Sequence, residues 1–171
     1  MSSNKGKDGE MRVAILLSNI SIAEEGCDFT RPTNTNTADG GADLVFEHPD
    51  GFTDSLVNIG NDSQKVTDIK ISEKIVKIRI DVKTTDKKLS LDTVIKFGGD
   101  IRKNPDCQGH MLVGGKSLTR GAQKKFEEIK NAVSEEGKNV NYIPNNGLNK
   151  IENHYNSLPK PVNLHDNNET N

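Results

Sequence analysis

Residues 74–86 read KIVKIRIDVKTTD, and charged and apolar residues alternate along most of this stretch. Successive side chains of a β-strand point to opposite faces of a sheet. The alternation therefore predicts a strand with one face in the core, made of Val76, Ile78, Ile80 and Val82. The other face carries four charges, Lys77, Arg79, Asp81 and Lys83. That face is either exposed to solvent or part of a chemical site, and the rest of the sequence must decide between them.

The segments before this strand predict a helix and further strands. Residues 8–25 have helical apolar spacing and end at Gly26. Residues 42–52 (ADLVFEHPDGF) are typical of a strand that ends in a Pro-Asp-Gly turn, with Asp43 on its polar face and Leu44 on its apolar face. Residues 54–71 (DSLVNIGNDSQKVTDIKI) suggest one or two more strands.

The segments after it alternate between helix and strand. Ser90 is predicted to cap a helix with an apolar stripe from Leu91 to Ile101, which stops before Pro105. A buried strand (109–115), a second amphipathic helix (117–137), a short strand (140–144) and a small helix (146–155) complete the pattern. This order predicts an α/β fold in which helices cover both faces of a mixed β-sheet. We expect one domain over residues 8–157, with flexible tails at 1–7 and 158–171.

The composition favours a protein that stays in the cytoplasm. The sequence has no apolar run of 18 residues, and the first ten residues, MSSNKGKDGE, lack the apolar middle of a signal peptide. Cys27 and Cys107 have neither metal-ligand spacing nor a disulfide framework around them, so we expect free thiols.

Positive charge is concentrated in the middle of an acidic chain. Residues 1–64 hold 4 Lys/Arg against 11 Asp/Glu, whereas residues 65–103 hold 11 Lys/Arg against 6 Asp/Glu. A basic middle third favours one surface built to bind a polyanion. Lysines that only keep a strand and a helix surface soluble would give the same pattern.

Three carboxylates and a lysine are candidates for a shared site. Asp81 and Lys83 are two residues apart, so they lie on one face of their strand, and Asp43 lies on the polar face of an earlier strand. Glu10 lies near the start of the first helix. Carboxylate oxygens suit Mg²⁺, and a neighbouring lysine can orient a water molecule and offset charge that develops on a phosphoryl group.

These residues resemble the signature of the PD-(D/E)xK nuclease superfamily. Asp43 followed by Asp81-Val82-Lys83 matches the signature, and residues 38–46 (ADGGADLVF) look like a segment of the Mrr-like restriction endonucleases. Residues 109–128 (GHMLVGGKSLTRGAQKKFEE) and 141–151 (NYIPNNGLNKI) are similar to later segments of that family. Two features depart from the family. Asp81 stands where those proteins usually carry Glu or Gln, and the long interval from Asp43 to Asp81 implies an extra hairpin.

The resemblance implies a restriction-endonuclease-like core and a Mg²⁺-dependent DNA endonuclease of restriction or phage-defence type, with Mn²⁺ as a substitute metal. Asp43 and Asp81 would bind the metal together with the Val82 carbonyl and Glu10, and Lys83 would position the attacking water. The charged strand face would then be the floor of an open cleft. The residues expected to contact DNA are Lys77, Arg79, Lys116, Ser117, Thr119 and Arg120. The expected partners are DNA and either a second copy of the chain or a separate specificity subunit.

Simpler interpretations exist for most of these residues. Asp81 and Lys83 could form a surface ion pair, which contributes about 0–1 kcal/mol. Glu10 could favour the helix dipole, and Thr119 could cap a helix. His48 and His110 fit a turn residue and a strand residue rather than catalysts. At the level of function, the alternatives are a nuclease of the Holliday-junction-resolvase type and a non-catalytic nucleic-acid-binding module that keeps the fold.

Overall fold

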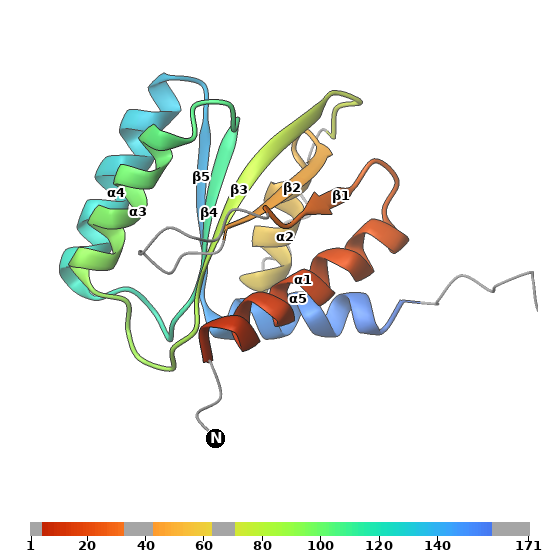
Figure 1. The fold of residues 1–171 in the computed structure, drawn as a ribbon, viewed down its shortest axis with the longest axis horizontal. Helices are drawn as coiled ribbons and strands as arrows, with labels where there is room; N and C mark the ends of the chain where they lie inside the picture. Colours follow the sequence, from red (N-terminus) through yellow and green to blue (C-terminus); the bar gives the residue numbers. More distant parts are fainter. Residues whose placement is uncertain (1–4, 33–42, 63–70, 159–171) are drawn as a thin grey trace, which may run out of the picture.

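The computed structural model describes residues 5–32, 43–62 and 71–158, and of Asp43 it describes the backbone but not the side chain. The described residues form five helices and five strands, which are coloured along the chain in Figure 1. In chain order they are α1 (Lys5–Ala23), β1 (Asp28–Thr30), β2 (Asp43–Pro49), α2 (Phe52–Gly60), β3 (Ile75–Lys83), α3 (Leu91–Lys103), β4 (Gly109–Gly114), α4 (Arg120–Glu135), β5 (Asn139–Ile143) and α5 (Asn145–Asn156).

The strands form one mixed sheet in the order β1-β2-β3-β4-β5. β1 and β2 pair antiparallel, as do β2 and β3, whereas β3, β4 and β5 run parallel to one another. Parallel neighbours need a crossover connection, and α3 and α4 supply the two crossovers. β3 is therefore the strand at which the antiparallel half of the sheet meets the parallel half.

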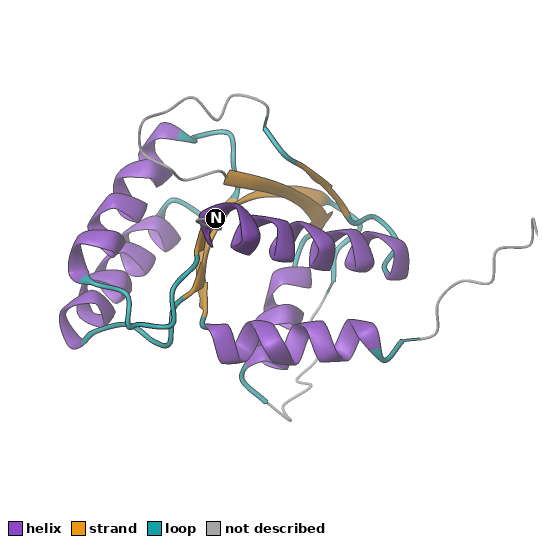
Figure 2. Ribbon diagram, turned by 60° about the horizontal axis from the view of Figure 1, so that its bottom comes forward, coloured by secondary structure: helices purple, strands orange, loops and turns teal. Residues whose placement is uncertain are grey.

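Helices cover both faces of the sheet, as the sequence predicted. α1, α2 and α5 lie on one side, and α3 and α4 lie on the other (Figures 1 and 2). Each side has its own apolar core. One core joins Leu16 of α1 and Leu148 of α5 to Ile80 of β3, and the other joins Phe97 of α3 and Phe126 of α4 to Leu112 of β4. The fold is thus the mixed α/β architecture expected of a restriction-endonuclease-like core.

The apolar face of β3 is buried, as its sequence predicted. The side chains of Val76, Ile78 and Ile80 are 7%, 4% and 2% exposed, and the last two lie in the core shared with α1 and α5. β2 lies beside it with Leu44 and Phe46 on the same apolar face, both fully buried. The charged residues of β3 consequently face α3 and α4.

Residues 52–60 form a helix, and the strand prediction for this segment is wrong. Phe52, Leu56 and Gly60 of α2 are buried and stand four residues apart, which is a helical spacing. The expected extra hairpin between Asp43 and Asp81 is therefore replaced, in the described part of the interval, by α2. Residues 63–70, which the strand prediction also included, lie outside the described residues.

The predicted cap at Ser90 is confirmed, and Thr119 has the capping role that was its simpler interpretation. Ser90 accepts a hydrogen bond from the Thr93 amide, and Thr119 accepts one from the Ala122 amide, so each side chain caps its helix. Flexible tails were predicted at 1–7 and 158–171. α1 begins at Lys5, so residues 5–7 are helical, and residues 1–4 and 159–171 lie outside the described residues. Across the described helices, none has both the length and the apolar character needed to span a membrane.

Candidate active site

Asp43 and Asp81 stand directly opposite each other in the ladder between β2 and β3. Directly opposed residues of an antiparallel pair have Cα atoms about 4.5–5.5 Å apart and project their side chains from the same face. The backbone therefore brings these two aspartates to one place, although 37 residues separate them in the sequence. Lys83 lies two residues beyond Asp81, on the same face of β3.

The Asp81 carboxylate is buried and surrounded by cations. Its side chain is 1% exposed. Lys83 Nζ lies 2.9 Å from Oδ1, and Arg79 Nη2 lies 3.5 Å from Oδ2. The contact with Lys83 joins opposite charges and is an ion pair, although Oδ1 accepts no hydrogen bond from the described residues. The predicted open cleft with Asp81 on its floor is thus corrected: the carboxylate lies beneath the surface, whereas Lys83 is 23% exposed.

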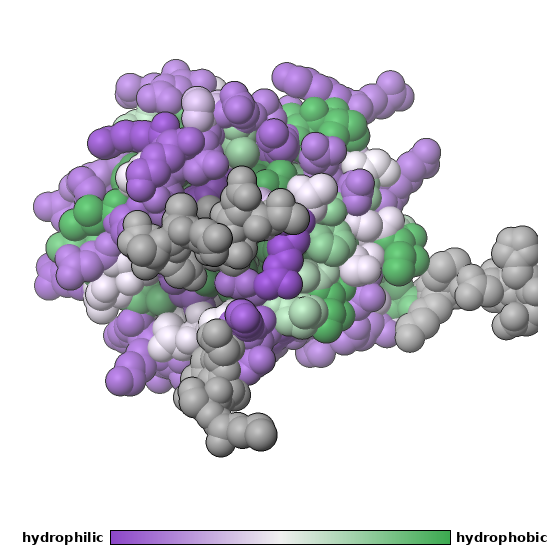
Figure 3. Space-filling view, viewed as in Figure 1, coloured by the Kyte–Doolittle hydropathy of each residue, from purple (hydrophilic) through white to green (hydrophobic). Residues whose placement is uncertain are grey.

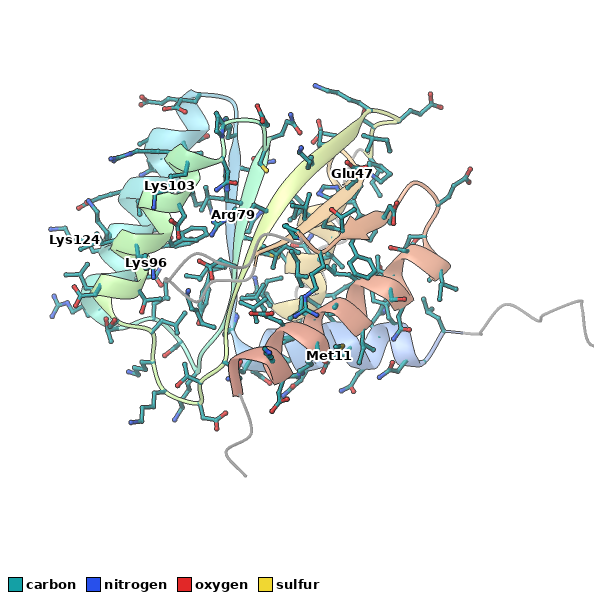
Figure 4. The ribbon with its side chains drawn as sticks, in the orientation of Figure 1. Met11, Glu47, Arg79, Lys96, Lys103 and Lys124 are labelled. Carbon is teal, nitrogen blue, oxygen red and sulfur yellow. The ribbon has the colours of Figure 1, made fainter. Side chains whose placement is uncertain are left out.

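Arg79 is an internal counter-ion rather than the DNA contact that the sequence predicted. Its side chain is 2% exposed and lies between the sheet and α3 (Figure 4). Its Nη2 lies 3.5 Å from Asp100 Oδ2 as well as 3.5 Å from Asp81 Oδ2. A guanidinium held under α3 by two carboxylates is not presented to a phosphate backbone. The alternating pattern predicted the face of the sheet from which Arg79 projects. It could not predict that Arg79 is buried, because α3 covers it.

Glu10 lies on α1 and is 8% exposed. Its Oε2 lies 3.0 Å from Nη2 of Arg31, which is near the end of the first described segment. The start of α1 packs closely against the chain just after β3, because a Cβ atom on Gly9 would lie 1.8 Å from Oγ1 of Thr84. Glu10 is therefore a buried, paired carboxylate on a helix that approaches the end of β3, and its role as a metal ligand stays a prediction.

The donor atoms at this place suit a hard divalent cation. Asp81 offers a buried carboxylate with one oxygen that accepts no hydrogen bond from the described side chains and backbone, and the β2–β3 register sets Asp43 opposite it. Oxygen donors of this kind are those that Mg²⁺ and Mn²⁺ prefer. The described side chains, which leave out that of Asp43, contain no group of three or more His, Cys, Asp or Glu placed to hold a metal.

Lys83 ends β3 at the edge of the sheet where β4 also ends. Gly114 of β4 has φ +116°, and a Cβ atom there would lie 1.9 Å from the Lys83 carbonyl oxygen, so the backbones of β3 and β4 are in contact at this point. A cavity of about 210 Å³ opens beside Lys83, with Val82, Thr84 and Asn145 among the residues that line it. The cavity gives small molecules and water access to the end of β3.

The loops at the same edge are basic and paired with each other. The Lys116 amide donates to the Lys87 carbonyl at 2.9 Å, and the Leu89 amide donates to the Ser117 carbonyl at 2.8 Å. Lys116 and Arg120 are exposed, whereas Thr119 is committed to capping α4. Lys77 lies towards the other end of β3, about 20 Å from Lys83 at 3.3 Å per residue. The predicted DNA contacts are therefore split between two ends of the strand.

The surface differs between the two sides of the molecule. Hydrophilic residues dominate the visible face over α3 and α4, whereas hydrophobic residues come to the surface over α1 (Figure 3). Met11, Ile15 and Ile22 of α1 are 49%, 56% and 63% exposed.

Near the site, sequence reasoning missed Asp100, and it took His110 only for a strand residue, which its place in β4 confirms. Asp100 lies on α3, and its pairing with Arg79 becomes visible only when α3 packs on the sheet. His110 stands opposite Arg79 in the β3–β4 ladder, is 2% exposed, and has no hydrogen-bond partner for either ring nitrogen among the described residues. Burial, with the nearby charges of Arg79 and Lys138, lowers the pKa of His110 to about 4. The one available sequence signal for Asp100 was Arg79, because a charged residue on a buried strand needs a counter-ion.

No protein-family model and no curated protein matches this sequence. Among solved structures, the chain is similar to one described as EndoMS in apo form, with a TM-score of 0.43 and 12% sequence identity. The similarity covers 80% of this chain and 45% of that one, so this chain spans less than half the length of the matched structure.

Proposed function

We propose that this chain is a divalent-metal-dependent endonuclease that hydrolyses DNA phosphodiester bonds, of restriction or phage-defence type. The observation that carries the proposal is the β2–β3 register, which sets Asp43 opposite Asp81 with Lys83 two residues beyond. This is the arrangement implied by the resemblance to the PD-(D/E)xK nucleases. A surface ion pair does not describe the site, because Asp81 is 1% exposed. Burying its charge costs free energy that pairing and hydrogen bonds must offset.

The metal ligands in this proposal are Asp43, Asp81, the Val82 carbonyl and Glu10, with Mg²⁺ as the metal and Mn²⁺ as a substitute. When bound, such a cation makes water more acidic and polarises a phosphoryl oxygen. The aspartates hold it at the end of β3. Lys83, partly exposed and adjacent to Asp81, orients the attacking water and offsets negative charge on the phosphoryl group.

DNA binds, in this proposal, along the edge at which β3 and β4 end. Lys116 and Arg120 are exposed there, and the loop with Lys87 and Lys88 is hydrogen-bonded to the segment that carries Lys116. Exposed cations at one edge supply the electrostatic part of DNA binding, which does not depend on sequence. Ser117 and Lys77 remain proposed contacts, with Lys77 at the far end of β3.

A single domain of this kind, which we place at residues 8–157, has one site and cuts one strand. A double-strand break then requires a second copy or a partner subunit, and a two-fold dimer matches the symmetry of the duplex. Sedimentation of the purified protein at micromolar concentration, with and without a DNA duplex, tests this. A strict monomer that makes double-strand breaks at a rate linear in its concentration would contradict the dimer.

The function is tested by relaxation of a supercoiled plasmid. The purified protein should nick the plasmid with Mg²⁺ or Mn²⁺ and should stop when EDTA is in excess. Asp81→Asn and Lys83→Met should each lower the rate by a factor on the order of 100 or more. Lys130→Met, which removes an exposed lysine of α4 ten residues beyond Arg120, should keep nearly full cleavage.

The result that overturns the proposal is equally defined. If wild-type protein, folded by circular dichroism, relaxes no plasmid with either metal, the catalytic proposal fails and a binding module remains. Equal cleavage by wild type and Asp81→Asn would place the chemistry elsewhere. Preferential cleavage of four-way junctions over plasmid would favour a junction-resolving nuclease instead.

A further inference from the structure

Arg79 lies between two carboxylates and at the same distance from each. Its Nη2 lies 3.5 Å from Asp81 Oδ2 on the same strand and 3.5 Å from Asp100 Oδ2 on α3. Asp81 is already paired with Lys83 through its other oxygen, at 2.9 Å. Asp100 is 20% exposed and also pairs with Lys103, which lies on the solvent side of α3. Of these two carboxylates, Asp81 lies inside the candidate site and Asp100 lies outside it.

This geometry matters because a buried guanidinium cannot lose its compensating charge cheaply. Removing one partner of a buried ion pair typically costs several kcal/mol, since the remaining charge is left uncompensated. A divalent cation bound at Asp81 repels Arg79 and competes with it for the same carboxylate. Cation binding at Asp81 therefore removes compensating charge from Arg79, and Asp100 is a second carboxylate within reach of the same guanidinium.

We propose that Asp100 sets the affinity of the Asp81 site for a divalent cation by receiving the charge of Arg79. When a cation binds Asp81, Arg79 shifts its ion pair towards Asp100, and the interior stays neutralised throughout. Asp100 is a positioning residue in this scheme, because it acts through Arg79 and touches neither metal nor DNA. The inference rests on the proposed function, which places the cation at Asp81.

A purely structural role makes a different prediction. If Asp100 only ties α3 to the sheet, its loss lowers stability and leaves cation affinity unchanged. If it acts by its own distant charge, its loss weakens cation binding whether or not Arg79 is present. Coupling to Arg79 is the property that only the proposed exchange requires.

The test is calorimetric titration of the purified full-length chain with Mn²⁺ in the absence of DNA. Asp100→Asn should weaken Mn²⁺ binding by about tenfold, a change within the range of coupling energies for groups in contact. Asp100→Glu keeps the carboxylate and should restore most of the affinity. Lys103→Met removes the outer partner of Asp100 without touching Arg79, so its affinity should equal that of wild type.

The Arg79→Gln background measures the coupling. In that background the guanidinium charge is absent, and Asp100→Asn should change Mn²⁺ affinity by less than about twofold if the two residues act as a unit. If Arg79→Gln does not fold, Arg79→Met, which also removes the guanidinium charge, supplies the background for the same comparison. The variants Asp100→Asn, Asp100→Glu and Lys103→Met by themselves exclude a purely structural role, because Asp100 is 20% exposed and its variants should fold.

The outcomes separate this inference from the proposed function. If wild-type protein binds Mn²⁺ through Asp81 and cleaves DNA, and Asp100→Asn binds Mn²⁺ equally well, the role of Asp100 is overturned and the proposed function stands. An equal loss of affinity from Asp100→Asn with and without Arg79 also overturns that role. Wild-type protein that shows no Mn²⁺ binding sensitive to Asp81→Asn overturns both.

Discussion

Asp43 and Asp81 are partners in the β2–β3 ladder, so the two aspartates are fixed by backbone hydrogen bonding rather than by a loop. A shift of one residue in this register would send one aspartate to the opposite face of the sheet. The apolar residues hold the register, because Leu44 and Phe46 of β2 are fully buried beside Ile78 and Ile80 of β3. The core pattern and the acidic pair thus depend on the same alignment.

Asp81→Asn should lower stability as well as cleavage. Asp81 is 1% exposed, and its charge faces Lys83 and Arg79, so an amide leaves these cations less compensated. We expect the free energy of unfolding to fall by about 1–3 kcal/mol, as for a buried group that loses its partner. Urea denaturation followed by circular dichroism measures this.

Asp86→Asn is the matched control, since Asp86 is exposed, and its effect should stay within about 0.5 kcal/mol. DNA affinity of Asp81→Asn, measured by fluorescence anisotropy, should equal or exceed that of wild type, because one negative charge is lost. An Asp81→Asn protein as stable as wild type would show that the buried charge contacts contribute nothing to the fold.

The choice of metal should follow ion size and hardness. Mg²⁺ and Mn²⁺ should both support plasmid cleavage, whereas Ca²⁺ should support DNA binding without turnover, because it is larger and accepts looser coordination. Cleavage and gel-shift assays with each chloride salt, after treatment with EDTA and desalting, measure the two effects. Stoichiometric zinc that survives purification, or full cleavage in excess EDTA, would contradict the oxygen-ligand site.

His110 should make the protein less stable in acid. Its pKa is lowered to about 4, first by burial and then by the charges of Arg79 and Lys138, whereas an unfolded histidine titrates near 6.5. The unfolded chain therefore takes up this proton first, and stability falls as pH drops from about 6.5 to about 4. The loss from this residue should reach about 3 kcal/mol.

His110→Leu should remove this part of the acid sensitivity, because both ring nitrogens are buried without hydrogen bonds among the described residues. Thermal unfolding at several pH values between 4 and 7 measures the difference from wild type. His154→Gln replaces an exposed histidine and should follow the wild-type curve. Parallel curves for wild type and His110→Leu would disprove the assignment.

Two glycine substitutions should have opposite effects. Gly114 has φ +116°, and a Cβ atom would lie 1.9 Å from the Lys83 carbonyl oxygen, so Gly114→Ala should destabilise the fold by at least about 3 kcal/mol. Gly99 is inside α3, and a Cβ atom there would have no neighbour within 4 Å. Gly99→Ala should stabilise by about 0.5–1 kcal/mol, and chemical denaturation of both variants checks the contrast.

Local signals were sufficient where the sequence pattern and the structure coincide. The apolar face of β3, the stripe of α3 and the side-chain caps Ser90 and Thr119 each depend on residues that are close together in the chain. α2 was misread because its apolar residues were taken for strands, and its start lacks a side-chain cap. Its N-cap is Gly51, with φ +94°, rather than Ser, Thr, Asp or Asn.

The residues of the candidate site were predictable from the sequence, but their burial was not. The spacing of Asp81 and Lys83 placed them on one face, and the resemblance added Asp43. Whether solvent reaches that face depends on α3. This helix brings Asp100 to Arg79 from 21 residues further along the chain. Alternation within a strand gives the direction of a side chain, but only tertiary packing decides what covers it.

The position of β3 between an antiparallel and a parallel neighbour also has a consequence for folding kinetics. β3 has no free edge, because β2 occupies one side and β4 the other. The β2 pairing spans a long interval of chain, and the β4 pairing must wait for the α3 crossover, so both contacts are slow to close. Amide hydrogens at residues 78–82 should accordingly exchange only when the whole domain opens. While β4 is still inside the ribosome, β3 lacks one neighbour and Asp81 lies in an incomplete sheet. Any nuclease activity would therefore begin only after β4 has emerged from the ribosome.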